Sequence, residues 1–393
     1  MHKTIRVLSL LLTLSMLSAC QLFVLSAGFR SDQDMEARIL GDQSKTPSID
    51  LLALDQSVID YLDTHIDPAL QNWEIVDRLQ QILFSEEFLN IQYDDAANLT
   101  ASQTFAERRA NCLSLVNLYI GMARHLGLSA QYQTIQIRPI WNRKGELLIL
   151  SEHINALGRL GPSNQYIVDF TPEVRLQQQT AKLISDRQAT ALYYNNLGVE
   201  HLIAGDFDRS LEHFRYALAM DPLLAIAWNN VGSVLGRMGE ADLSEYSYLK
   251  ASALDRNSAS AANNLARLYF EQGEFAKSER YRRAVQSYNR RNPYYHYMLG
   301  NLAYEEKNFD AALRHFQEAI RREDQEPDFY MALGMTFREL GDEKAFTDLS
   351  QMSFAMRELG DQTYRPTQNR VRRVESRSVL RMTGSGISIR VVD

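Results

Sequence analysis

The chain has 393 residues, of which 45% are hydrophobic and 23% charged, so it is long enough for two or three globular domains of ordinary composition. Its net charge of −7 argues against nucleic acid as a partner, because phosphate binding depends on clustered lysine and arginine. The two cysteines, Cys20 and Cys112, stand in different surroundings, and an internal disulfide framework is not expected.

Residues 1–19 have the parts of a secretory signal: a basic start, an apolar stretch over 7–17 that is too short for a membrane helix, and small residues before Cys20. The ending Leu-Ser-Ala-Cys resembles the lipobox of bacterial lipoproteins, which implies a mature chain anchored by acyl chains on Cys20. Gln21, which is not aspartate, implies sorting to the outer membrane, facing the periplasm. An ordinary secretory signal is the alternative.

The segment after the signal is predicted to be a tether followed by helices. Residues 20–48 are polar and poorly periodic, so we expect a flexible tether there. Residues 49–90 carry apolar side chains at helical spacing and predict two helices separated by Pro68. A longer helix is predicted over 112–126, ended by Gly127.

Three strands are predicted after this helix, over 130–141, 147–157 and 165–170, with glycine-containing turns between them. A helix followed by a three-strand meander predicts an α+β domain, which we place over residues 49–185.

Cys112 is the first residue of the predicted helix, and Asn111 is a good N-cap. A helix N-terminus and a nearby imidazolium both favour the thiolate, which is the nucleophilic form. His153 on the second strand would exchange the proton, and Asp169 at the end of the third would orient the imidazole. The Cys112 amide and, as a weaker candidate, the Tyr93 hydroxyl would stabilise an oxyanion. The alternative is that Cys112 is a small core residue.

The segment from about Tyr93 to Thr171 resembles the transglutaminase-like superfamily, which has a papain-like fold. The resemblance rests on five short stretches, at 100–105, 111–114, 124–128, 152–153 and 168–172. It implies that the nucleophile, the histidine and the acidic partner of that family fall on Cys112, His153 and Asp169.

This sequence departs from the family pattern near the expected pocket. Asn111 stands where glycine is common, and Ile154 and Asn155 stand where aromatic residues are common. Members of the family include peptidases, amidases, protein cross-linkers and inactive relatives, so the fold does not select a reaction.

From residue 191 onward one pattern recurs every 34 residues. Its small-residue position falls on Gly198, Gly232, Ala266, Gly300 and Gly334. The pattern resembles the tetratricopeptide repeat (TPR), a pair of antiparallel helices used for protein binding, whose units stack because one hairpin cannot bury its apolar face alone. We expect four good units and one degenerate unit over 190–360, with an irregularity near 281–293.

Residues 361–393 are rich in arginine, and we expect a solvated basic tail, with a possible hairpin formed by 378–382 and 387–392. Contact of this tail with an anionic membrane or glycan is the alternative.

The sequence therefore predicts a multidomain protein: an α+β papain-like, transglutaminase-like domain followed by an all-α TPR solenoid, held to a membrane through Cys20. The expected function is thiol acyl transfer on amide bonds by Cys112, His153 and Asp169, by a peptidase, amidase or transglutaminase route, with a protein or peptide in the repeat groove. The alternative is an inactive TPR scaffold that organises an envelope complex. Without a zinc-type spacing or a phosphate loop, no metal or cofactor is predicted.

Overall fold

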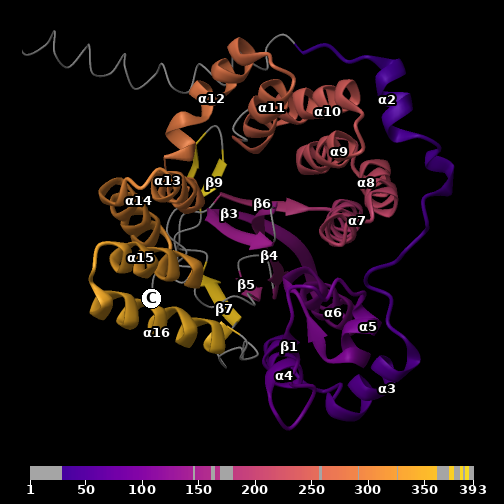
Figure 1. Cartoon of the computed structure of the whole chain (residues 1–393). Helices are drawn as coiled ribbons and strands as arrows, with labels where there is room; N and C mark the ends of the chain where they lie inside the picture. Colours follow the sequence, from indigo (N-terminus) through magenta and orange to yellow (C-terminus); the bar gives the residue numbers. More distant parts are fainter. Residues whose placement is uncertain are drawn as a thin grey trace, which may run out of the picture. The chain divides into compact units, whose positions relative to one another are not determined.

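In the computed structural model the chain folds into two compact units (Figure 1). The repeat unit contains residues up to 41 and 223–362, and the mixed unit contains 42–222 and the residues from 363 onward. The structure describes residues 29–144, 147–160, 164–168, 180–255, 259–290, 292–324, 326–360, 371–375, 381–383 and 386–388.

The mixed unit begins with short helices that precede the predicted thiol helix, of which α4 and α5 pack against it. Its helical elements are η1 (Gln43–Lys45), α3 (Gln56–His65), α4 (Asn72–Phe84), α5 (Ala101–Glu107) and α6 (Cys112–His125). The two helices expected around Pro68 are α3 and α4. The sequence did not predict α5, which has only seven residues and begins with a capping box in which Thr100 and Gln103 bond reciprocally. Gly127 adopts φ 78° after α6, as a helix-ending glycine requires.

A seven-stranded sheet forms the second half of the mixed unit, in the order β7-β5-β4-β3-β6-β9-β8. The antiparallel meander β3-β4-β5 confirms the three predicted strands. The strands are β3 (Ser129–Lys144), β4 (Leu147–Arg159), β5 (Asn164–Val168), β6 (Thr180–Ile184), β7 (Val371–Glu375), β8 (Arg381–Thr383) and β9 (Gly386–Ser388). A separate parallel pair joins β1 (Gln92–Tyr93) to β2 (Arg109–Ala110).

The sheet is larger than the sequence predicted. Strand β6 pairs with β3 on the side away from β4, and β7 pairs with β5. The tail was expected to be solvated, but its described residues supply β7, β8 and β9, of which β8 and β9 form a hairpin. A hairpin was predicted in this part of the tail, over 378–382 and 387–392, and the strands that form it are shorter. Strands β6 and β7 have five residues each and carry too short an alternation to identify from the sequence.

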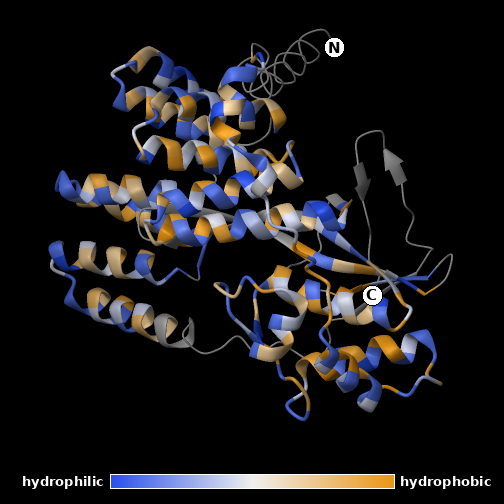
Figure 2. Cartoon of the chain, turned by 90° about the vertical axis from the view of Figure 1, so that its right-hand side faces the viewer, coloured by the Kyte–Doolittle hydropathy of each residue, from blue (hydrophilic) through white to orange (hydrophobic). Residues whose placement is uncertain are grey.

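Five helix hairpins follow, and they confirm the predicted repeats (Figure 1). The mixed unit contains α7 (Asp186–Ile203) and α8 (Phe207–Met220). The repeat unit contains α9 (Ala225–Arg237), α10 (Ala241–Leu254), α11 (Ala259–Glu271), α12 (Phe275–Asn289), α13 (Pro293–Glu305), α14 (Phe309–Arg322), α15 (Pro327–Glu339) and α16 (Glu343–Gly360). Apolar and polar residues alternate along these helices, as stacking of amphipathic hairpins requires (Figure 2).

The same contacts recur in successive hairpins. A Cβ added at Gly232 would lie 2.7 Å from the Tyr248 ring, and one added at Gly300 would lie 2.4 Å from the Phe316 ring, so only glycine allows the two helices this approach. The Ser244 hydroxyl donates to the Gly232 carbonyl at 2.7 Å. Equivalent serine bonds of 2.7 Å join Ser210 to Gly198 and Ser278 to Ala266.

The turn inside each hairpin uses a left-handed residue. Four of the five turns place glycine there, at Gly205, Gly239, Gly273 and Gly341, with φ between 77° and 85°. The turn between α13 and α14 places Lys307 there instead, with φ 58°. The left-handed residues of all five turns are 34 residues apart, so this backbone conformation repeats even where the residue is not glycine.

The predicted irregularity near 281–293 falls where one apolar cluster ends and another begins. The first cluster joins α10, α11 and α12 and ends at Tyr281 and Val285. The second joins α13 to α16 and is centred on Phe316 and Leu333. Among the described residues the two clusters share no member, so the hairpins on either side of this segment pack around separate clusters.

Residues 20–48 were expected to be an unstructured tether, but part of this segment is helical. Helix α2 (Gln33–Leu40) begins at Asp32, whose side chain accepts from the amides of Asp34 and Met35, and Ile39 is fully buried. The sequence pattern missed α2 because eight residues hold too few apolar positions for a period to show.

Candidate functional site

Cys112 is the first residue of α6, as predicted, and its side chain is partly exposed. Asn111 is the N-cap, and its Oδ1 accepts from the Ser114 amide at 2.9 Å. The Ser114 hydroxyl donates to the Ala97 carbonyl and accepts from the Leu99 amide, both at 2.7 Å. The first turn of α6 is therefore bonded to the 97–99 loop, which fixes the backbone that carries the thiol.

The strands that carry the other predicted catalytic residues lie beside α6. Helix α6 packs against β3 and β4, and the Tyr132 hydroxyl of β3 donates to Asn117 Oδ1 of α6 at 2.7 Å. His153 lies in β4, opposite Ile135 of β3. Strand β5 is the next strand after β4 and ends at Val168. Asp169, the predicted orienting carboxylate, lies outside the described residues, so the triad stays a prediction.

Two further candidate residues were predicted, Tyr93 for the oxyanion and Cys20 for lipidation. Tyr93 ends β1, and its backbone pairs with Ala110, two residues before Cys112. It is therefore close in the fold to the thiol helix. Cys20, the predicted lipidation site, lies outside the described residues. Of the helices in the described ranges, none is both long and apolar enough to cross a membrane.

The interior of the mixed unit between α6 and the sheet is packed with tyrosines. Burial raises the pKa of Tyr119 well above its usual range, and it also raises the pKa values of Tyr132 and Tyr166. A Cβ added at Gly158 of β4 would lie 1.9 Å from the Tyr166 ring on β5. These tyrosines are uncharged at neutral pH and hold α6 on the sheet, so they position the thiol helix.

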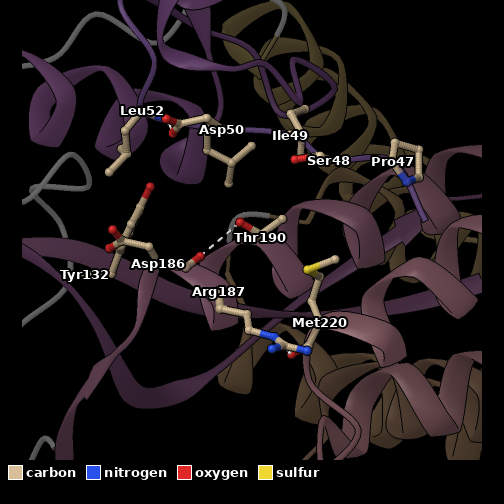
Figure 3. Close-up of a pocket in the computed structure, with 11 residues that line it drawn as sticks. Pro47, Ser48, Ile49, Asp50, Leu52, Tyr132, Asp186, Arg187, Thr190 and Met220 are labelled. Carbon is tan, nitrogen blue, oxygen red and sulfur yellow. Dashed lines mark hydrogen bonds between the residues drawn. The ribbon is translucent and has the colours of Figure 1, made fainter. Parts of the chain in front are cut away.

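A cavity of about 280 Å³ opens in the mixed unit between the 47–52 segment, Tyr132 and the end of α8 (Figure 3). Its charged groups are engaged within the unit. Asp186 forms an ion pair of 2.6 Å with Arg124, and Arg187 donates to the carbonyls of Met220 and Ala219 at 2.7 and 2.8 Å. Within the described ranges, no three histidine, cysteine or acidic side chains converge as a metal site would need.

The first helices of the repeat hairpins present a different kind of surface. Asn264 of α11 donates to Asn229 Oδ1 of α9 at 2.9 Å, and both side chains are partly exposed. One 34-residue period after Asn264 stands Met298 of α13, which is 54% exposed, followed one turn later by Leu302 at 52%. Neighbouring first helices thus combine amide groups with exposed apolar side chains. The 34-residue pattern places Asn264 and Met298 at the same position of the repeat, but it does not by itself predict a role in binding.

The comparisons with known proteins agree with this part of the fold. Models of the tetratricopeptide repeat match residues 195–252, 297–346 and 258–292. The chain therefore contains tetratricopeptide repeats, the class of helical array that serves as a protein-binding scaffold. The family matches lie within the repeats, so the transglutaminase-like resemblance before them stays a prediction. No curated protein matches the chain significantly.

The solved structures that are similar to the chain include those of MamA, PilF and YrrB. MamA is 20% identical over 42% of this chain and 97% of its own, with a TM-score of 0.29. PilF of Pseudomonas aeruginosa is 23% identical over 43% and 78%, with a TM-score of 0.33. YrrB, described as a TPR protein with an unusual peptide-binding site, is 17% identical over 43% and 87%, with a TM-score of 0.25. Likeness at this level says nothing of what this chain binds.

Proposed function

We propose that the chain is a lipid-anchored scaffold whose repeat unit binds a polypeptide along the first helices of its hairpins. The observations that carry this proposal are the hydrogen bond between the partly exposed Asn264 and Asn229 side chains on α11 and α9, and the exposed Met298 and Leu302 side chains on α13, the next first helix. An amide side chain both donates and accepts, as a peptide backbone does, and exposed apolar side chains supply contact area for a partner's side chains. The matches to the tetratricopeptide repeat support the same function.

Site-specific cross-linking tests this proposal. A photo-cross-linking residue placed at Asn264 of the full chain should capture a polypeptide of defined mass, whereas the same residue at the exposed Glu240 should not. Replacing Met298 and Leu302 by serine should weaken capture at Asn264 at least tenfold without unfolding the protein, since both side chains are exposed. Equal capture at Asn264 and Glu240 would refute the surface as a binding site.

The anchor has its own test. Cys20→Ala should move the protein from the detergent phase to the aqueous phase on phase separation, because acyl chains on Cys20 provide the membrane affinity. Detergent-phase partitioning that is the same for the variant and the wild type would contradict lipidation.

A cysteine acyltransferase is the second candidate function, favoured by the partly exposed Cys112 at the start of α6, a helix that packs against β3 and β4. In this reaction Cys112 attacks an amide carbonyl, the amine leaves with a proton from His153, and water or another amine resolves the thioester. A thiol-alkylating reagent at pH 7 should then react with Cys112 faster than with a model thiol, and His153→Gln should remove the difference. A rate equal to that of the model thiol excludes this candidate.

A further inference from the structure

Helix α2 is bound to the second helix of the first hairpin in the repeat unit. The Asp32 amide donates to the Tyr246 hydroxyl at 2.9 Å, and that hydroxyl donates to Glu36 at 2.7 Å. Glu36 also forms an ion pair with Lys250, one turn further along α10. The Phe29 ring lies 5.3 Å from the Tyr246 ring. Segment 29–40 therefore meets α10 through a carboxylate, a helix cap and an aromatic contact.

The Lys250 side chain that receives Glu36 is packed against α9. The Lys250 side chain is 14% exposed, and its ammonium lies 4.5 Å from the centre of the Trp228 ring, which is 1% exposed. A cation held against an aromatic ring in this way is already positioned for an anion. A mostly buried ammonium also needs a counter-charge, and Glu36 provides it.

Helix α2 depends on this contact for its own structure. A helix of eight residues is not stable alone in water, because too few hydrogen bonds offset the cost of nucleation. The segment therefore folds when it docks, so its helicity reports whether the α10 surface is occupied.

We propose that the Trp228–Tyr246–Lys250 surface is a receptor for a short acidic helix, and that its occupant is residues 29–40 of the same chain. Docking joins Cys20 to the repeat unit through a short connection. The eight residues between Cys20 and Phe29 span about 30 Å at most. If α2 were released, the chain from Cys20 would first meet a folded unit at Asp42 of the mixed unit, and the residues between them would span about 70 Å. This consequence for membrane distance rests on the proposed anchor, but the docking itself does not.

Charge reversal tests the docking in the full chain. Hydrogen–deuterium exchange of the amides over 33–40 should speed up at least tenfold in Glu36→Lys and in Lys250→Glu, and should return to within about threefold of wild type when both changes are combined. Asp34→Lys is the matched control, since Asp34 is exposed on the same helix, and exchange should stay within about threefold of wild type. Unchanged exchange in both single variants, or no recovery in the double variant, would overturn the proposal.

A second measurement separates the docking from the anchor. Energy transfer from a dye at Glu240 to labelled lipid in vesicles should fall in Glu36→Lys, because the longer connection lets the repeat unit move away. Transfer that is absent in the wild type, while the exchange results hold, would reject the anchor and keep the docking. Transfer that stays equal in both proteins, with exchange unchanged, would reject the docking.

Discussion

The repeat unit and the mixed unit differ in how their contacts are spread along the chain. In the first hairpin of the repeat unit Gly232 meets the Tyr248 ring and Ser244, and parts of this set return at 34-residue intervals, as the bond of Ser278 to Ala266 and the contact of Gly300 with Phe316. In the mixed unit each contact occurs once and joins distant residues, as in the pairing of β5 with β7 from the tail. A repeated local contact can be read from one sequence, whereas a single long-range contact leaves no comparable pattern.

The largest effect is expected from a core residue of the repeat unit. Trp228→Ala should lower the free energy of unfolding of this unit by about 3–5 kcal/mol, because it empties a fully buried site. Urea unfolding with exchange mass spectrometry measures the effect. Phe270→Ala is the control, and with 63% exposure it should cost less than about 0.5 kcal/mol. A loss that spreads to the mixed unit would show that the two units unfold together.

The next largest effect is expected when a closely packed glycine is replaced by alanine in each unit. Gly158→Ala and Gly232→Ala each place a Cβ against a buried ring, at 1.9 Å from Tyr166 and 2.7 Å from Tyr248. Each should cost about 1–3 kcal/mol or more, with Gly158→Ala the larger. Exchange should rise throughout the sheet for Gly158→Ala but mainly in α9, α10 and their neighbours for Gly232→Ala. If exchange rose over an equally wide region in both variants, the contrast between local contacts in the repeat unit and long-range contacts in the mixed unit would be contradicted.

A smaller effect is expected at the repeated serine. Ser244→Ala removes the 2.7 Å bond to the Gly232 carbonyl, and we expect a loss of about 1 kcal/mol. Thermal unfolding of this variant and of the Ser278→Ala variant should show similar shifts, since Ser278 makes the same bond to Ala266. Clearly unequal shifts would mean that the repeats are not equivalent in energy.

The smallest effect concerns pH. Burial raises the pKa of Glu36, but hydrogen bonds from Lys250, Ser31 and Tyr246 and the charge of Lys250 outweigh it, so the pKa lies below the ordinary value of 4.5. Docking of α2 therefore contributes stability above pH 4.5 and loses it as the pH falls through the lowered pKa. Exchange of residues 33–40 should rise across this acid range, and Glu36→Gln should remove the dependence. If exchange in the wild type depended on pH in the same way as in Glu36→Gln, the role of the Glu36 carboxylate in docking would be contradicted.

The contrast between the units also explains what the sequence predicted. The small residues at 34-residue intervals predicted five hairpins, and the pattern over 112–126 predicted α6 within one residue at its end. Helix α5, helix α2 and strand β6 were missed, because seven, eight and five residues are too few for a period to be seen. Cys112 was placed correctly at the start of α6, because a cap and a helix are local features. Whether His153 and Asp169 lie close to the thiol depends on contacts between residues that are far apart in the chain. A single sequence carries no recurring pattern that predicts such contacts.

Lys307 has a consequence for engineering this array. A non-glycine residue in the left-handed region costs about 1–2 kcal/mol relative to right-handed backbone, and glycine largely avoids this cost. Lys307→Gly should therefore raise the melting temperature of the repeat unit, with a gain of about 0.5–1 kcal/mol after the greater freedom of glycine in the unfolded chain is subtracted. Lys307→Gly is therefore the first substitution to make in a more stable form of this repeat array.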